Sequence, residues 1–129
     1  MYQWVEHAAE LELRIEAPTE QAVFADALAA FAELVDGGGD PDRHELELEA
    51  DDPASLLVEW LNELVYLADV EQFVPERLAE LELDGGRLRA TVEGRRGEPR
   101  PLVKAVTLHG LAFQPDGEAG WRARVVLDV

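Results

Sequence analysis

The chain has 129 residues, no cysteine and a formal net charge of −17. We expect one domain over residues 1–129 that buries its core without disulfides, and the missing thiols exclude thiolate metal sites. So many carboxylates disfavour direct nucleic-acid binding, which needs Lys and Arg to neutralise phosphates, and favour a cation or a basic protein as partner. An acidic surface that serves only solubility is the alternative.

The sequence also carries information on location. It shows no basic and apolar secretory signal at the N-terminus. No apolar run approaches the ~20 residues that a membrane-spanning helix needs. We therefore expect a cytoplasmic protein without membrane contact.

The first half of the chain alternates between strand and helix patterns. The predicted strands cover 2–6, 10–16 and 44–50, and the predicted helices cover 20–35 and 53–69. In 10–16, Leu11 and Leu13 alternate with Glu12 and Arg14, which is the period of a strand with one buried face. Thr19 is a good N-cap for the first helix. Asp52 followed by proline predicts the start of the second helix.

The second half reads as strands alone. They are predicted at 78–84, 87–95, 103–113 and 121–129. Gly85-Gly86 predicts a hairpin turn between the first two. A loop over 94–101 holds the basic cluster Arg95, Arg96 and Arg100, which we expect to balance charge locally. The order ββαβαββββ predicts an α+β fold, a two-layer sandwich with a mostly antiparallel sheet covered by two helices.

Candidate functional residues are polar side chains on strands. The chain has no P-loop, GxGxxG, GxSxG or HExxH motif. His7 and Glu10 bracket the turn between the first two strands. Thr107 and His109 are two apart, so they share a strand face, and Lys104 points to the opposite one.

Asp128 follows the apolar run of the last strand. A carboxylate at this position offers the oxygen ligands that calcium and magnesium prefer. Each candidate also has an interpretation without a functional role. A carboxylate at a strand end is usually just exposed, and a histidine on a strand usually occupies a half-buried position with its hydrogen bonds satisfied.

Four segments, taken together, resemble motifs of the archease family. They are YQWVEHAAELEL (2–13), LLVEWLNELVYLAD (56–69), VKAVTLHGL (103–111) and WRARVVLDV (121–129). They follow the family's order and are spread over the whole chain. Ala8, Glu10 and Leu108 stand where the family motifs have threonine, aspartate and an aromatic residue.

The resemblance implies a small α+β protein that is a cofactor for the tRNA-splicing RNA ligase, and not itself an enzyme. That ligase joins a 3′-phosphate or cyclic phosphate to a 5′-hydroxyl. Archeases promote attachment of guanylate to the ligase's active-site histidine and let it turn over repeatedly. The implied partner is therefore a protein, with no direct nucleic-acid binding.

The resemblance also implies a divalent-metal site. By motif position its ligands fall on Glu10, Asp128 and the main-chain oxygen of Val129. Calcium is the first expectation, with magnesium or manganese as alternatives. The remaining motif positions place partner-directed residues at His7, Lys104, Thr107 and His109.

Two other functions stay open. One is a general acidic binding or chaperone-like module that has no metal and no dedicated ligase partner. The other is a small metal-dependent hydrolase with Glu10 as general base beside His7 or His109. That chemistry needs a substrate pocket and a tuned pKa, and the sequence indicates neither.

Overall fold

The computed structural model describes residues 1–129 apart from 8–9, 36, 100–104, 119 and 129, and the side chain of His109 is likewise not described. The strands are β1 (Tyr2–His7), β2 (Glu10–Ala17), β3 (Asp40–Glu49), β4 (Phe73–Asp84), β5 (Arg87–Arg96), β6 (Ala105–Asp116) and β7 (Gly120–Asp128). The helices are α1 (Glu20–Leu34) and α2 (Pro53–Asp69). The predicted order ββαβαββββ is confirmed.

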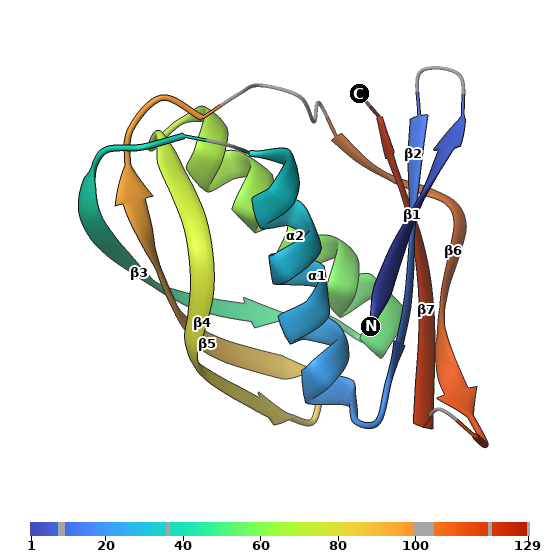
Figure 1. Ribbon diagram of the computed structural model, residues 1–129. Helices are drawn as coiled ribbons and strands as arrows, with labels where there is room; N and C mark the ends of the chain where they lie inside the picture. Colours follow the sequence, from blue (N-terminus) through green and yellow to red (C-terminus); the bar gives the residue numbers. More distant parts are fainter. Residues whose placement is uncertain (8–9, 36, 100–104, 119, 129) are drawn as a thin grey trace.

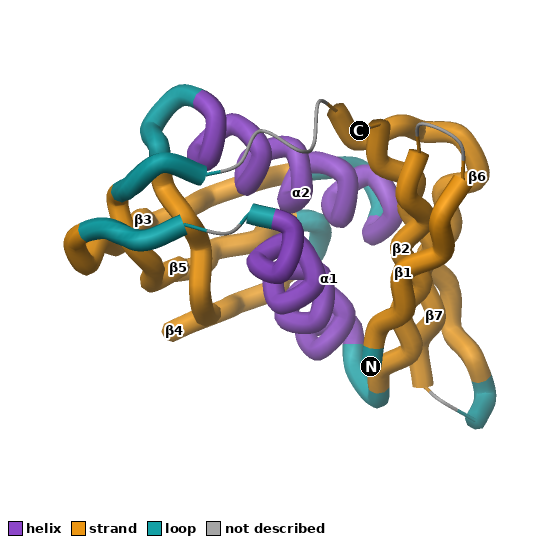
Figure 2. Tube along the Cα trace, turned by 45° about the horizontal axis from the view of Figure 1, so that its top comes forward, coloured by secondary structure: helices purple, strands orange, loops and turns teal. Residues whose placement is uncertain are grey.

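The strands form two antiparallel sheets, ordered β1-β2-β7-β6 and β3-β5-β4. Both helices lie between the sheets and contact both of them (Figures 1 and 2). The α+β class, the antiparallel pairing and the two covering helices are confirmed. The arrangement has one layer more than the expected two, because strands of either sheet show the same period of two and the sequence does not assign them to sheets. Within the described residues, neither helix is long and apolar enough to cross a membrane.

Both helices begin at the predicted caps. The Thr19 Oγ1 accepts a hydrogen bond from the Ala22 N–H at 3.1 Å, and an Asp52 carboxylate oxygen accepts one from the Ser55 N–H at 2.8 Å. Each bond satisfies a backbone donor that the first helical turn leaves unpaired.

The core lies where the helices cross between the sheets. Trp60 of α2 is fully buried, and its Nε1–H donates to the Phe24 carbonyl of α1 at 3.0 Å. The two rings meet edge to face, and Phe113 of β6 packs on Phe24 from the four-stranded sheet. Full burial of one such side chain is worth about 1.5–3 kcal/mol. These contacts fix α1, α2 and the four-stranded sheet relative to one another.

Two strands begin several residues earlier than predicted. β3 begins at Asp40, where we expected a loop, and β4 begins at Phe73 rather than 78. Bulges between Pro75 and Arg77 and between Leu78 and Glu80 hide the alternation of early β4. Pro41 is a residue that usually indicates a loop, so the start of β3 was not predicted. β3 is an edge strand, where proline is tolerated.

The basic cluster is only partly a loop. Residues 94–96 belong to β5, because Asp40 and Pro41 extend its pairing to Arg96 and Arg95. Arg95 forms an ion pair with Glu76 at 3.3 Å, as expected for local charge balance. Arg100 lies outside the described residues.

Candidate functional site

The candidate ligands come together through the pairing of β2 with β7. Glu10 is the direct antiparallel partner of Asp128, and His7 of β1 is the partner of Glu10 on its other side. The Cβ atoms of direct partners lie about 4.5–5.5 Å apart. The two carboxylates are therefore neighbours, although they come from the first and last thirds of the chain.

These carboxylates are suited to a cation. Both side chains are partly exposed, and no ion pair joins either of them to another described residue. Like charges directly opposite each other on a sheet repel. A cation between them would relieve that repulsion, and oxygen donors are the ligands that calcium, magnesium and manganese prefer. The chemistry of the donor set thus fits a hard divalent ion.

The described side chains supply two ligands rather than a full set. No group of three or more His, Asp or Glu side chains in the described parts of the chain is placed to hold a metal. Calcium takes six to eight oxygens. The other oxygens would have to come from the main chain, from water or from a partner.

The other predicted residues are placed as follows. Val129 and Lys104 lie outside the described residues. Thr107 pairs with Val126, which lies two residues before Asp128 on β7. Residues two apart on a strand share a face, so Thr107 lies on the same face of the sheet as Asp128. The backbone of His109 belongs to β6, in the irregular stretch between Thr107 and Ala112. The pairing therefore brings His7, Glu10 and Asp128 into one row and sets Thr107 beside it.

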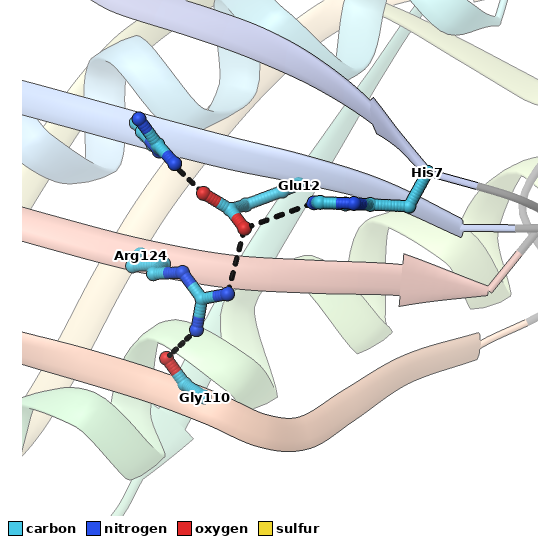
Figure 3. A network of polar contacts seen from close by, with 5 residues as sticks. His7, Glu12, Gly110 and Arg124 are labelled. Atoms are coloured by element: carbon cyan, nitrogen blue, oxygen red, sulfur yellow. Dashed lines mark hydrogen bonds and ion pairs between the residues drawn. The ribbon is translucent and has the colours of Figure 1, made fainter.

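Glu12 was not identified as a site residue from the sequence. It lies two residues after Glu10 on the same face of β2. Alternation placed it on the outer face as a surface residue, but it is only 1% exposed. Arg124 Nη2 donates to Glu12 Oε1 at 2.6 Å, His7 Nε2 lies 3.2 Å from the same oxygen, and Arg14 pairs with Oε2. Figure 3 shows Glu12 held between side chains from neighbouring strands. The signal appears only once the register is known, since Arg14 and Arg124 are cross-strand partners.

The arginines keep Glu12 ionised. The hydrogen bond from Arg124, and then that from Arg14, lower the pKa of Glu12 to about 2, although burial alone would raise it. The same bond raises the pKa of Arg124. An ionised carboxylate only accepts hydrogen bonds, so the His7 Nε2 carries the proton that faces it. In neutral His7 the free lone pair is then on Nδ1.

This network has two effects on the candidate ligands. Arg14 and Arg124 are engaged by Glu12, so they do not neutralise the carboxylates of Glu10 and Asp128. Arg124 Nη1 also donates to the Gly110 carbonyl at 2.8 Å, which ties the irregular part of β6 to the centre of the sheet (Figure 3).

Comparisons with known proteins agree with the motifs. The model of the Archease protein family (MTH1598/TM1083) matches residues 2–129. Protein archease of Pyrococcus furiosus is 35% identical, with 100% of both chains covered. Protein archease of Pyrobaculum neutrophilum is 32% identical over 99% of this chain and 95% of that protein.

Solved structures share the fold. The solution structure of Methanobacterium thermoautotrophicum protein 1598 matches with a TM-score of 0.68 and 25% identity, over 99% of this chain and 98% of that one. A crystal structure of an archease, possible chaperone (TM1083), from Thermotoga maritima matches with a TM-score of 0.72 and 22% identity, over 100% and 98%. Family model, relatives and fold lead to the same conclusion, and the chain belongs to the archease family.

Proposed function

We propose that this protein is a non-catalytic activator of the tRNA-splicing RNA ligase, acting in the cytoplasm. It promotes guanylylation of the ligase's active-site histidine and supports repeated turnover in tRNA splicing and RNA repair. Membership of the archease family supports the proposal, as does the acidic surface, which suits a basic, RNA-binding protein partner.

The observation that carries the proposal is the cross-strand pair of Glu10 and Asp128. Two adjacent carboxylates repel each other, and this pair has no arginine partner among the described residues. The repulsion destabilises the sheet unless a cation lies between the two groups. Their use here is to hold a divalent cation, with the main-chain oxygen of Val129 as a further ligand. A cation bound there would supply a fixed positive charge at the ends of the two central strands.

The chain's own side chains have separate roles around that pair. Glu10 and Asp128 provide oxygen donors. Glu12 orients His7 through Nε2, and Nδ1 takes no part in that contact. Thr107 and His109 of β6, together with Lys104, are the residues that we assign to the contact with the partner. None of these roles requires the protein to form a covalent intermediate.

The test is single-turnover guanylylation of the source organism's own RNA ligase, with GTP and divalent metal, in the presence and absence of this protein. We expect clear acceleration at stoichiometric or lower amounts. Asp128→Ala and Glu10→Ala should each lose it. Glu16→Ala removes the same charge from the same face of β2, at a residue paired with Arg122, and should accelerate like the wild type.

Two results would contradict the proposal. If both ligand variants activate like the wild type, the carboxylate pair has no part in the function. If the folded wild type does not accelerate its ligase, the general binding or chaperone-like function takes precedence, in line with the description of the Thermotoga maritima relative as a possible chaperone. That function predicts that aggregation of several unrelated client proteins is suppressed regardless of Asp128.

Metal binding can be measured without the ligase. Isothermal titration calorimetry of the metal-free protein with calcium should show binding. Asp128→Asn should raise the dissociation constant at least tenfold, because one of the two charged ligands is lost. Parallel titrations with magnesium and manganese rank the ions. Equal binding by wild type and variant would place the ion elsewhere.

A further inference from the structure

The second sheet turns its outer face away from the helices, on the far side of the molecule from the carboxylate pair (Figure 1). Because β5 lies between β3 and β4, residues on this face form cross-strand rows of three. Along the sheet the rows are Glu49–Arg87–Asp84, Glu47–Arg89–Glu82, Glu45–Thr91–Glu80 and Arg43–Glu93–Arg77.

Three of the four rows follow one rule: a central charge on β5 lies between two opposite charges. Arg87 forms an ion pair with Glu49 at 3.8 Å, and Arg77 donates to Glu93 at 2.9 Å. Arg89 stands between Glu47 and Glu82 in the same way by register. Opposite charges at directly paired positions stabilise a sheet.

The row of Thr91 breaks the rule. Glu45 and Glu80 flank a neutral residue, and neither forms an ion pair with any described residue. Thr91 is only 5% exposed, and within the described residues its hydroxyl makes no side-chain hydrogen bond. The hydroxyl nevertheless keeps some exposure, because Trp4 alone has a fully buried side-chain polar atom without a partner among the described residues.

Thr91 borders a hollow in the surface of the sheet. The hollow has a volume of about 400 Å³, and its charged lining residues are Glu45 and Glu80 of this row and Glu47, Glu82 and Arg89 of the adjacent row, so its lining carries four carboxylates against one guanidinium. Two strand spacings separate the flanking strands by about 10 Å, so a group inserted over Thr91 would reach both carboxylates. Every unsatisfied group in this row is an acceptor or is able to accept.

The matching ligand is therefore a donor-only cation. A guanidinium has five N–H donors in a planar fork and no acceptor, so it can serve two carboxylates and a hydroxyl at once. Arg89 takes the equivalent central position one row away, so the sheet already accommodates this group there.

We propose that the Glu45–Thr91–Glu80 row binds an arginine side chain of a protein partner, which completes the row as Arg89 completes the next one. The site is independent of the carboxylate pair of Glu10 and Asp128. It does not depend on the identity of the partner proposed above.

The test is an NMR titration of ¹⁵N-labelled protein with N-acetyl-arginine amide at low ionic strength. We expect saturable shifts centred on the amides of Thr91, Glu45 and Glu80. Glu45→Gln and Glu80→Gln should each weaken binding up to about fivefold, the range of an exposed ion pair. Thr91→Arg should abolish binding, because the chain then fills its own row.

The matched control is the double variant Glu49→Gln, Asp84→Asn. It removes two charges from the same two strands, at the row of Arg87, and should bind the probe like the wild type. N-acetyl-lysine amide is the second probe, and we expect it to bind more weakly because an ammonium does not span both carboxylates.

Each contrary result overturns a stated part of the inference. Equal weakening in the control would mean attraction by net charge alone. Binding by folded Thr91→Arg at wild-type strength would place the arginine elsewhere. Equal binding of the lysine probe would reject guanidinium recognition. Because Glu45→Gln does not touch the buried position, it decides the question even if Thr91→Arg fails to fold.

Discussion

At the residue scale, Glu12 is the most constrained charged side chain among the described residues. It is buried, yet both carboxylate oxygens accept hydrogen bonds from arginines on β2 and β7. Its stabilising effect is limited by exposure of those arginines, whose side chains are 55% and 37% exposed. Partly solvated cations gain less from pairing than buried ones.

Glu12→Gln should lower the free energy of unfolding by about 1–3 kcal/mol, the range for removing one partner of a buried hydrogen-bonded group. The variant keeps the side-chain volume but leaves Arg14 and Arg124 without a negative partner. Urea unfolding measures the change. Glu16→Gln breaks only the exposed pair with Arg122 and should cost less than about 1 kcal/mol. Equal costs for the two variants would contradict a special role for Glu12.

The effect of Glu12 should depend on pH. Its pKa is lowered from 4.5 to about 2 in the folded protein, so its contribution to stability is complete above pH 4.5 and is lost as the pH falls toward 2. The stability difference between wild type and Glu12→Gln should therefore shrink across that window. Other carboxylates titrate in both proteins and cancel in the difference. A difference that stays constant from pH 5 to about 2 would contradict the lowered pKa.

At the element scale, β6 depends on the same network. Its register shifts between Thr107 and Ala112, and Gly110 in that stretch has a φ of +68°. A Cβ atom on Gly110 would come within 1.7 Å of Arg124 Nη1, so the arginine occupies the space that the missing side chain leaves. The irregular stretch of β6 and the buried Glu12 are therefore linked through Arg124.

Gly110→Ala should destabilise the protein more than Gly85→Ala. Both glycines have positive φ, but nothing lies within 4 Å of a Cβ at Gly85. Each substitution carries the cost of a left-handed backbone, roughly 1–3 kcal/mol, and only Gly110→Ala also displaces Arg124 from Glu12. Thermal unfolding of the two variants gives the comparison. Equal effects would mean that Arg124 moves aside freely.

Much of the element pattern was predictable, because regular alternation and helix caps are local signals. Thr19 and Asp52 cap the helices as expected. The start of β4 was not predictable from alternation, because two bulges interrupt it. The pairing of β2 with β7 is non-local, so the neighbourhood of Glu10 and Asp128 came from motif resemblance and was absent from the spacing. The burial of Glu12 depends on that same pairing, so the alternation of residues within 10–16 does not indicate it.

At the scale of the whole molecule, charge opposes folding. A net charge of −17 on 129 residues produces self-repulsion that salt screens. Ion pairs such as those of Glu12 and Glu93 offset it only locally.

Raising sodium chloride from about 0.05 M to about 0.5 M should therefore shift the urea midpoint upward. The same change should weaken association with a basic partner, chiefly by slowing the association rate. Unfolding curves and stopped-flow binding measure the two effects. A midpoint that falls with salt would mean that attractive pairs outweigh the repulsion.

The pairing of β2 with β7 also has a consequence for biosynthesis. During translation, the β1–β2 hairpin leaves the ribosome before β7, with Glu10 in place but without its strand partner. Until then the hairpin has an unpaired edge and an uncovered apolar face, both of which favour association with chaperones. Asp128 reaches Glu10 only when the last strand has been added. A ligand that needs both carboxylates therefore binds only to chains in which β7 has been made and has paired with β2.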